Sequence, residues 1–435
     1  MIGKEWTSSR RPALLLLACL TACGDDASTP PTGISLGGPD GTAAIDHVAV
    51  TDDGDLMVGG RFQGTLAFGA LAPITSVAQQ DGFFARLAPD GTVAWARGFG
   101  GLPASFNRDD SVTGVAAMAD GSVVVTGYVE GTVDLGGGPI AEEPDGSRGA
   151  LFVARYAADG AHLWSQRWHS GRGSSEAQGV TVGADGAIYI AARFTARADI
   201  GPLQLDLGTV PEYVVVKLTA DGVVQWAKPL RATPPTDPFP GTYNAYAPLL
   251  IGGEVYVSGF MDGVIDFGSG PLGQAQSRST YIMKLAAATG ERIAERNYSE
   301  VESPPGGRRI LAAPDGDLVL VGPHIVRLAP DLSIVSTIDL SALVYDDGYD
   351  GHAAFRSTGE LVWVARYAYV RFGADGVEQA RETFPLGGTV ELHDVAVGAD
   401  DQVHVVGGYT AGFTLAGETF ADPAGRARGF VTATP

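Results

Sequence analysis

The stretch "RLAPDGTVAWARGFG", Arg86 to Gly100, predicts two strands joined by a tight turn at Asp90-Gly91. Nearly the same phrase returns as "RYAADGAHLWSQRW" from Arg155 and as "KLTADGVVQWAKPL" from Lys217. A phrase that recurs at wide spacing indicates copies of one supersecondary unit, which together bury a surface that no single copy buries alone. The repeat therefore decides the fold, and the Asp-Gly turns and tryptophans in it are expected to be structural.

A second hairpin phrase precedes this one, for example "HVAVTDDGDLMVGG" from His47. Its alternation of apolar residues around a Gly-containing turn favours two more strands. The turn residue marks seven copies along the chain: Gly54, Gly121, Gly186, Gly253, Gly316, Gly359 and Asp401. Each copy thus predicts four strands, here called A to D, and the fifth and sixth copies are shorter because they lack the middle segment.

The seventh copy lacks its strand D, because the chain stops after "GFVTATP", which matches strand C. The stretch "GISLGG" at residues 33–38 matches the end of a strand D. An open sheet edge is a hazard that closed architectures avoid. We therefore predict one all-β domain at residues 33–435, a seven-bladed β-propeller with four-stranded blades whose ring is closed by the N-terminal strand joining the C-terminal blade.

Residues 1–22 predict a lipoprotein signal peptide, since basic residues precede the apolar run "ALLLLACL", which is too short to span a bilayer. "LTAC" resembles the bacterial lipobox, which implies that Cys23 is lipidated, for example with palmitate. The alternative is an ordinary cleaved signal. Residues 23–32 are small, polar and Pro-containing, as expected of a flexible tether. In lipoproteins of this kind, Gly24 after the lipidated cysteine implies delivery to the outer membrane.

Composition limits the partners. The formal net charge is −21, and such a surface repels phosphate, so nucleic acid is not expected as a partner. The other cysteine, Cys19, lies inside the leader, so the mature fold is expected to contain no intrachain disulfide. The membrane is then reached only through lipid on Cys23, and we expect an exported protein anchored to the cell envelope.

The phrases "DDGDLMVGGRFQGTLAFG", "DGFFARLAPDGTVAWARGFGG" and "GFMDGVIDFGSGPL" resemble the bacterial seven-bladed β-propeller repeat family (SBBP-type) of exported lipoproteins. The resemblance spans residues 33–435 and implies the fold but little about function. "AATGERIAE" from Ala287 is also similar to quinone-cofactor propeller repeats, but the tryptophan of that repeat is matched only at Trp95, Trp164 and Trp226. No cofactor is expected.

The candidate site comes from the residue seven positions before each turn marker. These residues are His47, Gly114, Gly179, Tyr246, Arg309, His352 and Asp394. Once the ring closes, copies six, seven and one are neighbours, so His352, Asp394 and His47 are predicted to meet at the mouth of the channel. Asp46 and His393 adjoin them. Imidazoles and carboxylates that converge in this way suit acid–base chemistry or a divalent metal, although capping of backbone groups is the simpler interpretation.

Three functions remain open. The first is a non-enzymatic binding scaffold for a protein or glycan, which uses the face of the ring that carries the long segments between strands B and C. The second is a hydrolase or lyase built on His47, His352 and Asp394. The third is a structural subunit of an envelope assembly. No Walker loop or HExxH motif occurs, so an enzyme is the less favoured interpretation. The acidic turns "TDDGD" at Thr51 and "YDDGYDG" at Tyr345 also invite a calcium interpretation, although Asp-Gly turns need no ion.

Overall fold

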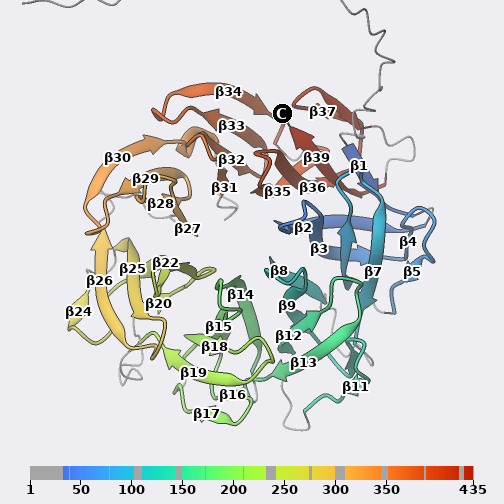
Figure 1. Ribbon diagram of the computed structural model, residues 1–435. Coiled ribbons are helices and arrows are strands. Elements are labelled where there is room, and N and C mark those ends of the chain that lie inside the picture. Colours follow the sequence, from blue (N-terminus) through green and yellow to red (C-terminus); the bar gives the residue numbers. More distant parts are fainter. Residues whose placement is uncertain are drawn as a thin grey trace, which may run out of the picture.

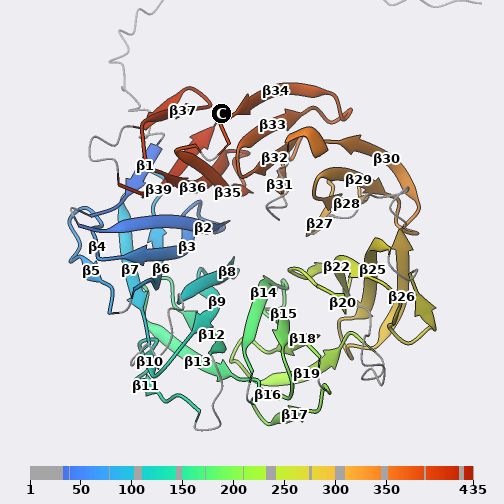
Figure 2. The same cartoon turned by 180° about the vertical axis from the view of Figure 1, so that it is seen from behind.

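A computed structural model describes most of the chain after residue 32. The described ranges are 33–38, 40–77, 79–101, 110–143, 149–171, 173–208, 210–231, 242–273, 277–298, 309–343, 351–386, 388–420 and 426–434. The predicted signal peptide, the tether and Cys23 lie outside them. Figures 1 and 2 show seven sheets arranged as a ring around a central opening, which confirms the seven-bladed propeller.

Blades one to three each contain four antiparallel strands in the order A, B, C, D from the channel outward. Blade one contains β2 (Thr42–Val50), β3 (Leu56–Gln63), β6 (Asp81–Leu87) and β7 (Val93–Phe99). Blade two contains β8 (Ser111–Ala117), β9 (Val123–Val129), β12 (Ala150–Tyr156) and β13 (His162–Trp168). Blade three contains β14 (Ser175–Val182), β15 (Ile188–Phe194), β18 (Glu212–Leu218) and β19 (Val224–Pro229).

Blades four to six continue the ring. In blade four, strand A is divided into two short pieces, β20 (Thr242–Tyr243) and β21 (Leu249–Ile251), followed by β22 (Glu254–Asp262), β25 (Arg278–Ala286) and β26 (Arg292–Tyr298). Blade five contains β27 (Arg309–Ala312), β28 (Leu318–Val321), β29 (His324–Leu328) and β30 (Ile334–Asp339), followed by the short 3₁₀ helix η1 (Ser341–Leu343). Blade six contains β31 (His352–Phe355), β32 (Leu361–Ala365), β33 (Ala368–Phe372) and β34 (Glu378–Thr383).

Blade seven is built from both ends of the described chain, as the sequence predicts. Its strands are β35 (Val390–Val397), β36 (Val403–Tyr409), β39 (Arg428–Thr434) and, as the outer strand, β1 (Gly33–Leu36). β1 pairs antiparallel with β39, with Ile34 opposite Val431 and Leu36 opposite Gly429. The buried Leu36 side chain then joins the core between blades seven and one, so the N-terminal strand supplies both the last ladder and apolar packing.

The hydrophobic core lies between the blades. The described residues form seven buried apolar clusters, one at each blade junction. Between blades one and two, for example, Phe84 and Phe99 pack against Phe152 and Tyr156. Strands B and C are covered on both faces, which explains why they read as nearly continuous apolar runs, whereas strand D is half-exposed.

The repeated tryptophans seal these junctions, as expected from the sequence. The indole N–H of Trp95 donates to the carbonyl of Ala158 in the next blade at 2.9 Å, and that of Trp164 donates to Ala220 at 2.8 Å. A Cβ added at Gly160, in the turn of blade two, would lie 2.7 Å from the Trp95 ring. The turn glycine is therefore required both for its positive φ of 82° and for the close approach of the ring.

The basic residue that opens each repeated phrase has a role that the sequence analysis did not assign. Arg86 donates to Asp55 at 2.5 Å and to Asp53 at 2.8 Å in its own blade, and to the carbonyl of Gly121 in the next blade at 2.8 Å. These contacts pair two carboxylates of the "TDDGD" turn, those of Asp53 and Asp55, with one guanidinium. The second acidic turn, "YDDGYDG" from Tyr345, lies largely outside the described residues.

The long segments between strands B and C fold as small hairpins on the outer rim in five blades. They are β4 (Thr65–Leu66) with β5 (Ile74–Thr75), β10 (Val133–Asp134) with β11 (Pro139–Ile140), β16 (Ala198–Ile200) with β17 (Leu203–Leu205), β23 (Ile265–Asp266) with β24 (Pro271–Leu272), and β37 (Phe413–Leu415) with β38 (Glu418–Phe420). Figure 1 places them at the periphery of the ring, away from the channel. In the described part of the chain, no helix reaches the length and apolarity of a membrane span.

Candidate functional site

A β-bulge positions the candidate residues on the inner strands. In β2 the ladder shifts between Ile45 and His47, and in β35 it shifts between Leu392 and Asp394. The extra residues are Asp46 and His393. A bulge bends its strand and re-aims side chains, so two consecutive polar residues of each strand meet the neighbouring blade instead of alternating between faces. The same shift occurs in β8 and β14.

Asp394 is the centre of the first cluster. His352 Nδ1 lies 2.6 Å from Asp394 Oδ1, and His47 Nδ1 lies 3.8 Å from Asp394 Oδ2. The guanidinium of Arg309 lies 3.5 Å from Oδ1. The backbone N–H groups of Val48 and Val395 also donate to this carboxylate, at 3.2 and 2.9 Å. The inner strands of blades five, six, seven and one thus meet at one buried carboxylate.

The electrostatics of this cluster keep Asp394 ionised. Burial raises the pKa of Asp394, but His352, Arg309 and the hydrogen bonds outweigh burial and hold it well below its ordinary value. Burial and the charge of Arg309 lower the pKa of His352 to about 4 against the opposing pull of Asp394. At neutral pH, His352 is therefore a neutral imidazole whose Nδ1–H donates to the carboxylate.

A second cluster lies beside the first, at the seam between blades seven and one. His393 Nδ1 lies 2.9 Å from Asp46 Oδ1 and 2.9 Å from the carbonyl oxygen of Ile45. His393 Nε2 lies 3.6 Å from Glu391, which in turn pairs with Arg366 at 2.6 Å. The His393 side chain is 2% exposed, so this imidazole is held between two carboxylates and out of water.

The charges of this second cluster support one another. Burial lowers the pKa of His393, but Asp46 and Glu391 outweigh burial and raise it to about 9. The neighbouring His393 imidazole, together with the guanidinium of Arg366, lowers the pKa of Glu391 to about 2 against the effect of burial. At neutral pH, His393 is therefore an imidazolium that joins the first and last blades by a charge-assisted contact.

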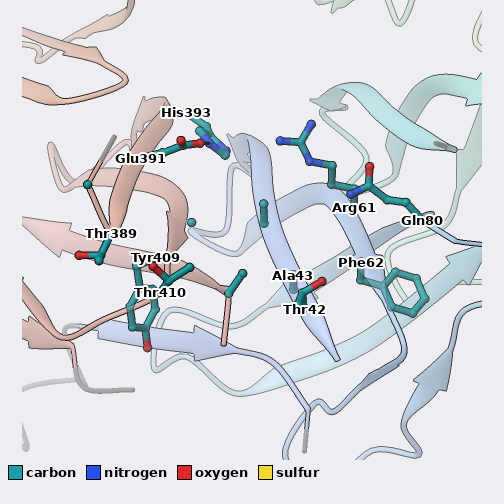
Figure 3. A pocket seen from close by; sticks show the side chains of 14 residues that line it. Thr42, Ala43, Arg61, Phe62, Gln80, Thr389, Glu391, His393, Tyr409 and Thr410 are labelled. Carbon is teal, nitrogen blue, oxygen red and sulfur yellow. Dashed lines mark ion pairs between the residues drawn. The ribbon is translucent and has the colours of Figure 1, made fainter. Parts of the chain in front are cut away.

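A cleft with a volume of about 260 Å³ opens beside the second cluster. Figure 3 shows its two walls: Thr389, Glu391 and His393 come from blade seven, and Thr42 and Arg61 come from blade one. These residues lie near the starts of strands A and the end of strand B, so the cleft is on the long-loop face. The Arg61 side chain is 42% exposed, and its guanidinium lies 3.7 Å from Asp46, a distance too long for a hydrogen bond. The guanidinium is therefore accessible to a ligand in the cleft.

The structure separates the five residues predicted from the sequence into these two clusters. His47, His352 and Asp394 meet as predicted, whereas Asp46 and His393 form a separate pair beside them. Within the described residues, no group of three or more His, Cys, Asp or Glu side chains has the arrangement of a metal site. Both oxygens of Asp394 are already engaged, so a metal ion would have to displace existing contacts.

Sequence reasoning missed Glu391, Arg61 and the cleft. Glu391 and His393 lie two residues apart in "VELHDVAV", and Arg61 follows the paired glycines of "MVGGRF". Each was unremarkable alone. The cleft exists only where the last copy of the repeat meets the first, so its two walls lie far apart in the sequence.

Comparisons with known proteins give the context of the fold. No known family model matches the sequence, and no curated protein does. The structure is similar to that of YCF48 bound to D1 peptide (11% identity, 94% of this chain and 96% of that chain, TM-score 0.46). It is also similar to a luciferin-regenerating enzyme (9% identity, 74% and 91%, TM-score 0.40) and to a protein of unknown function from Bacteroides caccae (12% identity, 69% and 90%, TM-score 0.41). Similarity at this level says nothing about the ligands of this chain.

Proposed function

We propose that this protein is an exported, lipid-anchored envelope protein of the SBBP-type propeller kind, which acts as a non-enzymatic binding scaffold for a protein or glycan through its long-loop face. The observation that carries the proposal is the cleft between blades seven and one. Binding sites are usually concave, with a few polar groups that fix the orientation of the ligand. This cleft combines an accessible guanidinium, Arg61, with threonine side chains on both walls.

The binding face is tested by site-specific photocrosslinking in the envelope of a bacterial host that makes the full chain. A photoreactive residue replaces Thr42 or Thr389 on the long-loop face. In matched controls it replaces Thr92 or Thr358 on the tight-turn face. All four threonines are exposed.

A defined adduct from Thr42 and Thr389, with none from Thr92 and Thr358, supports the scaffold. Adducts from the tight-turn face alone reverse the assignment of faces, and adducts of equal strength from all four positions favour a structural subunit packed on both sides. A protein that yields no adduct and retains no glycan from envelope extracts is not a scaffold of this kind.

The lipid anchor rests on the lipobox-like "LTAC" and has its own test. Cells that express the full chain are labelled with radioactive palmitate and fractionated, beside a Cys23→Ala variant. Label and outer-membrane location are expected for the unchanged chain, and both should be lost on substitution, because thioether formation at Cys23 attaches the lipid. Label that persists in the variant removes the anchor from the proposal.

A hydrolase or lyase is a second candidate, favoured by the 2.6 Å contact between His352 and Asp394. A carboxylate that orients an imidazole is a recurrent arrangement in acid–base catalysis. We test it by assaying the full chain on ester, glycoside and polyuronate substrates at neutral pH, beside His352→Ala. Turnover that the substitution lowers by a factor of about 100 or more supports an enzyme, and turnover equal in both proteins, or none in either, leaves the scaffold.

A further inference from the structure

One position on strand D varies around the ring in a way that bears on binding. It is the residue that pairs with the basic residue of strand C, and it is Trp95, Trp164, Trp226, Ala294, Ser336 and Ala380 in blades one to six. In the first three blades the indole ring packs against the turn of the next blade. The other three blades have a small residue in its place.

The three filled junctions share one geometry. The turn glycines opposite the rings are Gly160, Gly222 and Gly290, and a Cβ added to any of them would lie within 2.7 to 2.9 Å of the indole. The indole N–H donates to a turn carbonyl of the next blade at 2.8 to 3.2 Å. Each junction therefore contains an indole-shaped slot with one hydrogen-bond acceptor.

At the junction between blades four and five, the strand D position carries a small residue and the facing turn position carries a large one. Ala294 takes the place of tryptophan, and Leu332 takes the place of the turn glycine. Leu332 keeps the left-handed backbone, with φ of 68°, and its side chain is 6% exposed within the apolar cluster that contains Tyr298. A leucine supplied from the opposite wall accompanies the loss of the indole.

The junction between blades five and six lacks this compensation. Ser336 takes the place of tryptophan, but the opposite residue is still glycine, Gly376. A Cβ added to Gly376 would meet only Ile338, at 3.8 Å. The space left has a volume of about 90 Å³, and its lining includes Phe355 and Phe372.

The far wall of this cavity keeps the form that accepts an indole elsewhere. Gly376 has φ of 76°, close to the 82° of Gly160, and its N–H donates to Gly373 at 2.8 Å, as that of Gly160 donates to Ala157 at 2.8 Å. Ala374 occupies the turn position of Ala158, whose carbonyl accepts the indole N–H of Trp95. The acceptor position is thus retained although Ser336 brings no ring.

We propose that the cavity between blades five and six, on the tight-turn face, is a binding site for a small ligand that carries an indole ring. The ring inserts beside Ser336, packs against Gly376 as Trp95 packs against Gly160, and donates its N–H to the carbonyl of Ala374. This site is independent of the cleft between blades seven and one and lies on the opposite face.

The lining and the path of the main chain specify the occupant. Most of the lining residues are apolar. The charge of Arg327, which also lines the cavity, is balanced by Asp317 at 2.6 Å and by Asp315, and Asp375 adds a carboxylate to the wall. An anionic ligand is therefore not favoured. In the filled junctions, the ring is carried by the main chain of strand D. In blade five, β30 already occupies the position of strand D, so the main chain of a partner protein cannot lie there. A free molecule therefore fits the cavity better than a side chain of a partner protein.

The test titrates free indole into the full chain, with binding followed by calorimetry and by ligand-observed NMR. Ser336→Trp fills the cavity from strand D, and Gly376→Leu fills it from the turn, as Leu332 does one junction earlier. Ala380→Trp is the matched control, because it places the same ring at the same strand position of blade six. N-acetyl-tryptophanamide represents a side chain of a partner protein.

Saturable binding of indole to the unchanged chain and to Ala380→Trp, with at least a tenfold loss in Ser336→Trp and in Gly376→Leu, is the expected result. If Ser336→Trp does not fold, Gly376→Leu alone decides, since leucine at this backbone conformation is present at position 332. Absence of indole binding to the unchanged chain, equal binding to a folded filled variant, or binding of N-acetyl-tryptophanamide without binding of indole overturns the proposal.

Discussion

At the seam of the ring, His393 places one imidazole between carboxylates of two blades. Its pKa is raised to about 9 by Asp46 and Glu391 against the effect of burial. A group whose folded pKa lies above its unfolded value stabilises the fold fully below the unfolded pKa, here 6.5, and this contribution is lost as the pH rises through the folded value. The seam is therefore expected to weaken between about pH 6.5 and 9.

The first prediction concerns this residue. His393→Gln removes up to about 3 kcal/mol of unfolding free energy at pH 6, and the difference from the unchanged chain shrinks as the pH approaches 9. Urea unfolding at a series of pH values measures it. His162→Gln is the control. Burial lowers the pKa of His162, so replacing this residue should not change how the unfolding free energy depends on pH above neutrality. A constant difference at all pH values would show that His393 acts only by packing.

The second prediction concerns the turn glycines under the tryptophans. Gly222→Ala introduces a Cβ 2.9 Å from the Trp164 ring at φ of 81°, whereas Gly253→Ala has nearly the same φ, 83°, and no atom within 4 Å. The cost of placing alanine at a positive φ, about 1 kcal/mol of unfolding free energy, is common to both variants. Gly222→Ala is expected to lose about 1–3 kcal/mol more than Gly253→Ala, because its Cβ displaces the indole ring. Equal losses in the two variants, compared by thermal unfolding, would mean that the ring moves aside freely.

At the scale of the element, β1 carries the closure of the ring. Its ladder to β39 joins the two ends of the described chain, and Leu36, which is 2% exposed, packs in the core between blades seven and one. The apolar contact and the hydrogen-bonded ladder support the same register. Closure therefore depends on four residues at one end of the domain.

The third prediction follows for this strand. Leu36→Ala should lower the free energy of unfolding by about 3 kcal/mol, because it removes a buried side chain and leaves a cavity. Leu386→Ala, at a position that is 57% exposed, is the matched control and should change little. Chemical denaturation compares them, and a loss below about 0.5 kcal/mol for Leu36→Ala would show that β1 contributes little to closure.

The elements were predictable to different degrees. Strands and closure followed from period-2 patterns, turn glycines and the missing last strand, because these signals are local or concern the whole repeat. The seam cleft was not predictable, since Arg61 and Glu391 belong to different copies and meet only through the ring. The cluster at Asp394 was predictable by aligning copies, but the role of Arg309 as its cationic neighbour emerged only from the distances.

At the scale of the whole molecule, the net charge of −21 sets a long-range repulsion that individual ion pairs do not remove. Salt screens this repulsion over about 10 Å at 0.1 M. Buried contacts such as His393 with Asp46 are screened much less. The compact ring should therefore gain stability as ionic strength rises from low values.

The fourth prediction is that the urea midpoint rises when sodium chloride is increased from about 0.01 to 0.5 M at neutral pH. Urea is uncharged, so the salt effect is not confounded by the denaturant. Sodium sulfate and sodium chloride at matched ionic strength separate screening from ion-specific exclusion. A midpoint that falls with sodium chloride would mean that attractive surface pairs dominate over the net repulsion.

The pairing of Ile34 with Val431 also determines when folding is completed. The first strand of the ring along the chain, β1, waits for the last one, β39. Contacts between such distant parts of a chain form slowly, since a very long loop has to close first. During folding, six sheets can assemble from neighbouring residues while the seventh stays incomplete. A chaperone that shields the unpaired edge during that interval, or a truncation of the last few residues, would thus act on the same late step.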